Sequence, residues 1–255
     1  MSQSQEEDIW LDWYASKFGF GWLSDHLPGE IPPSYLYGIV LTLVIDPVTS
    51  VWTYFNGYRT VYLDNPYFLL QPVGLVVSIY ASRSLLRAYD DVMESMNVEG
   101  RADEPTSLTE IVPNWLPWLI LLAGVSFFWI NAHRIGFGRI YDDSGAVGIV
   151  AALVINPLVW GPIGAQFISV YLSIELRAPY QLVNSEVGIH FFDPERLGGL
   201  RPLGELIKQT YYYMVIGLIL YVLIIYHPLL ETQGPPPTTV ANVTFTGIWL
   251  VTVAT

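Results

Sequence analysis

Two polar residues lie inside apolar stretches of the chain, and each directly precedes a proline. They are Asp46, before Pro47, and Asn156, before Pro157. A carboxylate at membrane depth costs about a few kcal/mol, so such a residue faces water, an ion or a polar partner. The pair therefore predicts a polar pathway lined by two interrupted helices. The alternative is that each residue caps a helix that begins at its proline, at the membrane surface, where a carboxylate costs little.

A second set of candidate residues lies in the polar sequence GIHFFDPERLGGLRPLG, from Gly188 to Gly204. Its imidazole and carboxylate groups could ligate a metal ion, and its arginines, beside two glycines, could hold an anion in a backbone nest. These candidates are His190, Asp193, Glu195, Arg196 and Arg201. Their spacing matches no known metal or anion motif, which favours the alternative of a compact turn that leads the chain back into the membrane.

Both Asx-Pro pairs belong to a sequence that occurs twice. The first copy, GIVLTLVIDP, begins at Gly38 and the second, GIVAALVINP, begins at Gly148, a separation of 110 residues (148 − 38) with seven identities in ten positions. Two shorter matches, Pro-x-Gly and Leu-Arg-Ala, recur 90 residues apart. The first copy therefore carries 20 extra residues (110 − 90) between the two blocks, and we interpret the pattern as an internal duplication.

The polar stretch after Gly188, together with the Pro-x-Gly and Leu-Arg-Ala blocks, resembles that of uncharacterised multi-pass membrane proteins of haloarchaea. The resemblance covers roughly residues 145–227. It implies a membrane-spanning helical fold and carries no assigned activity, cofactor or partner with it.

The composition is that of a membrane protein. Apolar residues make up 52% of the 255 residues and charged residues only 13%, about half of what soluble domains carry, and the mean hydropathy is +0.41. The net charge is −12, with 23 acidic against 11 basic residues, and only two of the basic residues are lysines. Such a surface is typical of proteins that work in concentrated salt, where screening removes the repulsion between carboxylates. We therefore expect a halophilic archaeal source.

The same acidic balance argues against a nucleic-acid-binding face, so we expect no nucleic acid among the partners. The absence of cysteine excludes disulfides, thiol catalysis and cysteine-bound metals, and the sequence indicates no cofactor. No G-x-S-x-G, H-E-x-x-H or phosphate-loop pattern occurs, which disfavours familiar hydrolases and ATPases. The expected partners are the lipid bilayer and, within it, a second copy of the chain or other subunits of a membrane complex.

Apolar runs separated by polar linkers predict an all-α, polytopic bundle of about five or six transmembrane helices, built from two parallel repeats. The expected segments, in chain order, are an N-terminal amphipathic, interfacial segment at 1–34, a first transmembrane repeat with its cytoplasmic linker at 35–112, a transmembrane helix and outer loop at 113–144, a second repeat with its linker at 145–208, and C-terminal transmembrane helices at 209–255. The sequence leaves open whether 35–52 and 145–157 cross the membrane or only dip into it.

Arginine and lysine predict the orientation of such a bundle, because cytoplasmic loops are enriched in them. The linkers 83–112 and 177–208 hold three and four of these residues, seven in all, whereas the opposite loops hold three. We therefore place both linkers in the cytoplasm of a multi-pass cell-membrane protein. The side on which the N-terminus lies stays open.

Interrupted helices with polar residues at membrane depth are typical of transport sites. The leading hypothesis is therefore passage of a small solute or an ion, with Asp46 and Asn156 in the pathway. The second hypothesis is a structural or assembly subunit that holds its partners through the linkers and aromatic flanks. A membrane-embedded enzyme comes third and rests only on His190, Asp193 and Glu195.

Overall fold

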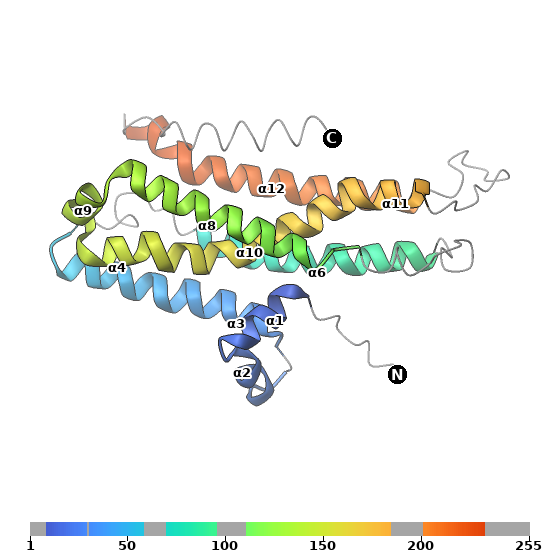
Figure 1. Ribbon diagram of the computed structural model, residues 1–255, viewed down its shortest axis with the longest axis horizontal. Helices are drawn as coiled ribbons and strands as arrows, with labels where there is room; N and C mark the ends of the chain where they lie inside the picture. The colour runs from blue at the N-terminus through green and yellow to red at the C-terminus, as the bar shows by residue number, and fades with distance from the viewer. Residues whose placement is uncertain (1–8, 30, 59–69, 96–110, 185–200, 233–255) are drawn as a thin grey trace. The chain divides into compact units, whose positions relative to one another are not determined.

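The computed structural model describes residues 9–29, 31–58, 70–95, 111–184 and 201–232, and within these ranges the chain forms helices and short turns with no strand (Figure 1). The expectation of an all-α protein is confirmed. Most of the polar stretch that begins at Gly188 lies outside the described residues.

The described helices are of two kinds, α-helices and short π-helices. The α-helices are α1 (Trp10–Lys17), α2 (Phe20–His26), α3 (Pro33–Val40), α4 (Asp46–Phe55), α6 (Leu70–Ser95), α8 (Trp115–Ile135), α9 (Phe137–Val150), α10 (Asn156–Leu172), α11 (Ala178–Asn184) and α12 (Arg201–Thr232). In the described part of the chain three short π-helices join some of them, η1 (Leu41–Ile45), η3 (Ala151–Ile155) and η4 (Ser173–Arg177).

Three helices in the described part of the chain are long and apolar enough to cross a membrane. They are Pro33–Phe55, which comprises α3, η1 and α4, then α8, and then Phe137–Gln181. The 23 residues of the first would extend about 35 Å, enough for a hydrocarbon core of about 30 Å. The membrane character of the chain is therefore supported, while the number of five or six crossings and the parallel repeat stay predictions.

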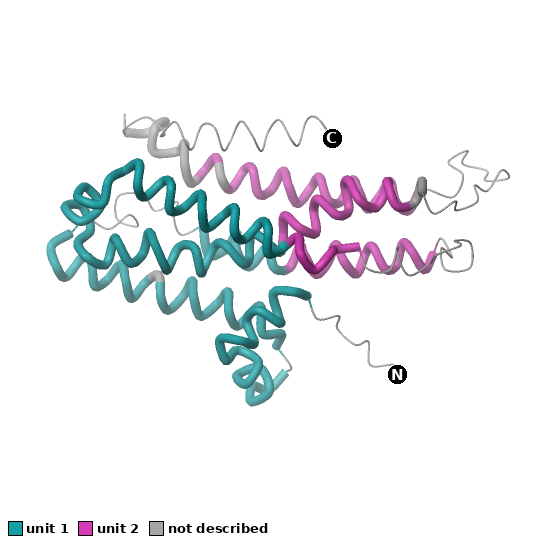
Figure 2. Tube along the Cα trace, in the orientation of Figure 1, with its two compact units in different colours: residues 1–79, 117–166 teal, residues 80–116, 167–255 magenta. Residues whose placement is uncertain are grey.

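The chain divides into two compact units (Figure 2). Unit 1 contains residues 1–79 and 117–166, and unit 2 contains residues 80–116 and 167–255. Both Asx-Pro pairs belong to unit 1, whereas the second Leu-Arg-Ala block belongs to unit 2.

In unit 1, α1 and α2 form a small N-terminal element, which we call the foot. The Ser34 N–H, in the first turn of α3, donates to Asp12 Oδ1 over 3.0 Å, and the Ile9 N–H donates to Asp12 Oδ2 over 3.1 Å. The carboxylate of Asp12, which is 2% exposed, thus accepts hydrogen bonds at the starts of both α1 and α3. These are the positions where backbone N–H groups lack a helical partner.

Contacts at the two ends of unit 1 establish the directions of its long helices. At the foot, a backbone N–H of α1 donates to Gln166 Oε1 over 3.2 Å, and Trp10 packs edge-on against Trp118 with ring centroids 5.1 Å apart. At the opposite end, the ring of Tyr58 lies against Gly145. The α3–η1–α4 helix and α8 therefore run away from the foot, and α10 runs back toward it.

Gly38 and Gly148 occupy the same position in the duplicated sequence but are crowded by different neighbours. A Cβ on Gly38 would lie 2.7 Å from Cδ1 of the buried Ile79, so any larger residue there would force this side chain of α6 to move. A Cβ on Gly148 would lie 2.5 Å from the Cβ of Ser144, one turn earlier in its own helix and next to the kink at Gly145, where φ is +65°.

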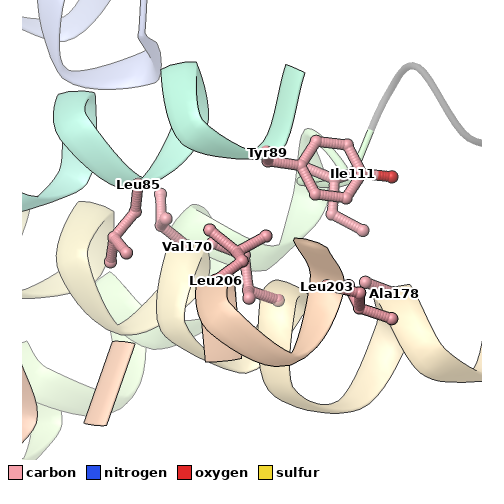
Figure 3. Packing of buried hydrophobic residues seen from close by; sticks show 8 residues of the cluster. Leu85, Tyr89, Ile111, Val170, Ala178, Leu203 and Leu206 are labelled. Carbon is pink, nitrogen blue, oxygen red and sulfur yellow. The ribbon is translucent and has the colours of Figure 1, made fainter. Parts of the chain in front are cut away.

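Unit 2 is organised around a cluster of buried apolar side chains from its helices and from the segment before α8, shown in Figure 3. The cluster contains Leu85, Tyr89, Ile111, Val170, Ile174, Ala178, Leu203 and Leu206. Burial, reinforced by the Asp90 carboxylate and opposed by the Arg177 guanidinium, raises the pKa of Tyr89 to about 12, so this phenol stays neutral at physiological pH.

Candidate functional site

The first part of the candidate site is the backbone around the first Asx-Pro pair. Between α3 and α4 the chain forms the five-residue π-helix η1, and Asp46 and Pro47 then open α4. Proline has no N–H to donate, and its ring clashes with the carbonyl group four residues earlier in an α-helix, here that of Leu43. The wider π turn accommodates the proline while the helix continues.

The second Asx-Pro pair has the same backbone arrangement. The π-helix η3 also contains five residues, and Asn156 and Pro157 open α10 directly after it. Its first residue follows that of η1 by 110 positions (151 − 41), which equals the separation of the duplicated sequences. Single π turns inside α-helices are rare and occur frequently at functional sites. Both pairs therefore mark the strongest candidate region in the described chain.

An aromatic side chain from another helix completes the second π turn. The indole N–H of Trp129, in α8, donates to the carbonyl oxygen of Leu153 over 3.0 Å. Leu153 lies four residues before Pro157, so its carbonyl is the one that an ordinary residue at 157 would have bonded in an α-helix. Trp129 thus replaces the donor that the proline removes.

The same replacement occurs one turn later. Pro162 lies inside α10, and the carbonyl group four residues before it belongs to Leu158. The hydroxyl of the buried Tyr37, in α3, donates to that carbonyl oxygen. Pro157 and Pro162 are therefore each matched by an aromatic donor from another helix, which ties α10 to α8 and to α3.

The backbone around the two Asx-Pro pairs differs from both forms expected from the sequence. Ile45, before α4, and Asn156, after η3, both have helical φ and ψ, so α4 and α10 continue the helices that precede them and neither Asx residue acts as an N-cap. The helices are distorted at these points and not interrupted, because a π turn tolerates proline without ending the hydrogen-bonded run. Asn156 is half-buried. The side chain of Asp46 lies outside the described part of the structure, so the pair is located by its backbone alone.

The other candidate residues are mostly outside the described ranges. His190, Asp193, Glu195 and Arg196 fall in the stretch 185–200, and Arg201 is the first residue of α12. Among the residues that the structure describes, no group of three or more histidine or acidic side chains is placed to hold a metal ion.

Sequence reasoning missed a polar group in unit 2, on the π-helix η4. Glu175 is 9% exposed, its side chain hydrogen-bonds with that of Tyr211 in α12, and its Oε1 atom is buried without a hydrogen-bond partner in the described structure. The hydroxyl of Ser173 is also buried and without a partner there. The sequence carries a signal for this group, because Glu175 directly follows a stretch, 144–174, that contains no charged residue.

Unit 2 also holds a hollow of about 510 Å³ between α6 and α12. Its lining includes Asp91 from α6 and Glu205 and Lys208 from α12, and the last two form an exposed ion pair over 3.6 Å. None of the residues predicted for a site lines it. Its charged lining is two carboxylates and one ammonium group, and the ammonium is already paired with one of the carboxylates, so the hollow indicates no particular ligand.

Comparisons with protein-family models, with curated proteins and with solved structures found no match to this chain. The resemblance to multi-pass membrane proteins of haloarchaea therefore stays a prediction from the sequence.

Proposed function

We propose that the chain is an integral membrane protein that passes a small solute or an ion, with the two π-helical turns as its pathway. The observation that carries this proposal is the occurrence of the same π turn before Asp46 and before Asn156, inside two helices that are long and apolar enough to cross a membrane. A π turn shifts backbone carbonyl groups away from their α-helical donors, and a carbonyl or amide oxygen at membrane depth can replace water around a cation.

The position of Asp46 along its helix supports this role. It lies 13 residues after Pro33 and 9 before Phe55 (46 − 33 and 55 − 46). These separations correspond to about 20 Å and about 14 Å along an α-helix, which places the residue near the middle of the candidate span. A charge there costs about 2.5–3.5 kcal/mol on insertion scales, so its presence favours a functional role over a structural one.

The proposal is tested by flux measurements in liposomes. Asp46→Leu should lower cation or solute flux about tenfold or more, because a loss of about 1.4 kcal/mol of stabilisation slows passage tenfold. Asp46→Asn should change the ion selectivity while retaining the fold, since the shape is kept and only the charge is removed. Val51→Ala, at an exposed position of α4 outside the π turn, is the matched control and should leave flux unchanged. Wild-type protein that carries no ion, water or small solute in the same liposomes rules out passage.

The second candidate is a structural or assembly subunit, and one observation favours it. Only 11% of the α8 window and 28–29% of the other two windows are buried inside the chain, so most of the surface of these helices is available to lipid or to another subunit. The size of the purified protein in lipid nanodiscs distinguishes these cases. A single copy in each nanodisc that conducts in liposomes supports passage by the monomer, whereas a stable complex without flux supports assembly.

A further inference from the structure

The foot carries several aromatic side chains that nothing else in the described chain covers. Trp13, Phe18 and Trp22 are each at least half exposed, and Trp118, against which the foot packs, is 44% exposed. Trp13 and Trp118 meet edge-on, with ring centroids 5.8 Å apart, so their rings belong to one continuous surface. The Lys17 ammonium lies 5.2 Å from the centre of the Trp13 ring and adds a positive charge to that surface.

This aromatic surface is held in a fixed position. Asp12 joins α1 to the first turn of α3 through its carboxylate. Gln166, the last residue of α10 that belongs to unit 1, accepts a hydrogen bond from the backbone of α1. Both side chains are 2% exposed, so these hydrogen bonds are shielded from water. The orientation of the foot relative to the candidate spans is therefore built into unit 1.

The level of the foot coincides with the level at which two candidate spans begin. α3 begins at Pro33, directly beyond the Asp12 hydrogen bond, and Trp118 lies in the first turn of α8. The ends of spans meet the boundary between lipid headgroups and acyl chains, where tryptophan and amphipathic helices are enriched. A lysine beside an exposed tryptophan suits the same boundary, because its ammonium can reach the headgroups while its stem stays in apolar surroundings.

We propose that the aromatic face of the foot binds the lipid surface itself, with its rings at the headgroup boundary, on the side of the membrane where α8 begins. Since the linker 83–112 leads into α8, this arrangement puts the foot on the same side as that linker, which its arginines assign to the cytoplasm. The proposal settles the side of the N-terminus that the sequence left open, and it is independent of solute passage.

Sidedness is tested by cysteine labelling, for which the chain is suited because it contains no cysteine. Single cysteines replace three exposed residues: Asp25 in the foot, Asn114 just before α8, and Asp143 at the opposite end of unit 1. In intact cells, a membrane-impermeant maleimide should label Asp143→Cys and should label Asp25→Cys and Asn114→Cys only after permeabilisation. Labelling of Asp25→Cys in intact cells overturns the proposal.

Contact with lipid is tested by tryptophan quenching in vesicles that carry brominated lipids. The double variant Trp13→Phe, Trp22→Phe should lower quenching by bromine near the headgroups by about one fifth or more, the share of two tryptophans among nine, because both rings sit at that level. Quenching by bromine at the ends of the lipid acyl chains, in the middle of the bilayer, should stay unchanged in this variant. The same quenching should fall in Trp129→Phe, which serves as the control for a tryptophan deeper in the membrane. If a second copy of the chain covers the face, the double variant leaves both kinds of quenching unchanged and weakens a dimer, which overturns the proposal.

Discussion

The two π-helical turns share a backbone but differ in what covers them. In the second turn, Leu153 is partly buried and its carbonyl accepts a hydrogen bond from Trp129, whereas in the first turn the equivalent Leu43 is 61% exposed. The shared backbone is explained by the shared prolines, while the covering side chains come from segments outside the repeated sequence. The difference indicates that the second turn is fastened to α8 by one of its carbonyl groups, whereas the side chain of Leu43 in the first turn is uncovered.

The largest effect is expected from Tyr37→Phe, which removes the hydroxyl donor to the helix that follows the second π turn. The variant leaves the Leu158 carbonyl without its hydrogen bond beside a buried ring, and it should lower the free energy of unfolding by about 1–3 kcal/mol. Reversible unfolding in detergent micelles measures the change. Tyr54→Phe, an exposed tyrosine of α4, is the control and should change stability by less than about 0.5 kcal/mol. Equal effects of the two variants would contradict the role of Tyr37.

A smaller effect is expected from Trp129→Phe, because this indole is more exposed than the ring of Tyr37. The variant keeps an aromatic ring but loses the N–H donor to Leu153, so the free energy of unfolding should fall by about 1 kcal/mol. The matched control is Trp52→Phe, in the helix after the first π turn, where the indole is 61% exposed. If both variants have the same stability in the same micelles, the second turn does not depend on its aromatic donor and the contrast between the turns is lost.

The smallest effect is expected where the two turns are alike. Val44 and Val154 are equivalent positions and are 50% and 48% exposed. Val44→Ala and Val154→Ala should therefore change the unfolding free energy by similar amounts, each within about 0.5 kcal/mol. Melting curves of the two variants provide the measurement. A difference of more than about 1 kcal/mol between them would mean that one of the turns has a partner at this face in the micelle.

The sequence predicted where the helices are distorted but not how. Pro47 and Pro157 correctly predict the positions of the helix distortions, because the missing N–H is a property of proline itself. The capping alternative and the interrupted helix are both wrong, because local propensity does not reveal that Ile45 and Asn156 keep helical dihedral angles through a π turn. Whether a proline interrupts the helix or is accommodated in a π turn depends on the side chains that pack around the helix.

The donors that complete the second turn could not be predicted from the sequence. Tyr37 is 121 positions from its acceptor and Trp129 is 24 positions from its own, so no local spacing connects them. Asp12 presents the same difficulty, since in the sequence it is one polar residue of an amphipathic segment. Only the fold brings it to the first turn of α3, 22 positions away.

The paired glycines that open the duplicated sequence, Gly38 and Gly148, bear on how the two copies can diverge. An alanine at Gly38 would collide with a neighbouring helix, whereas an alanine at Gly148 would collide with a side chain of its own helix. The first collision could be relieved by a smaller residue at Ile79, and the second by a smaller residue at Ser144. The same residue type at these two matching positions therefore answers to two different steric contacts, one with another helix and one within its own helix.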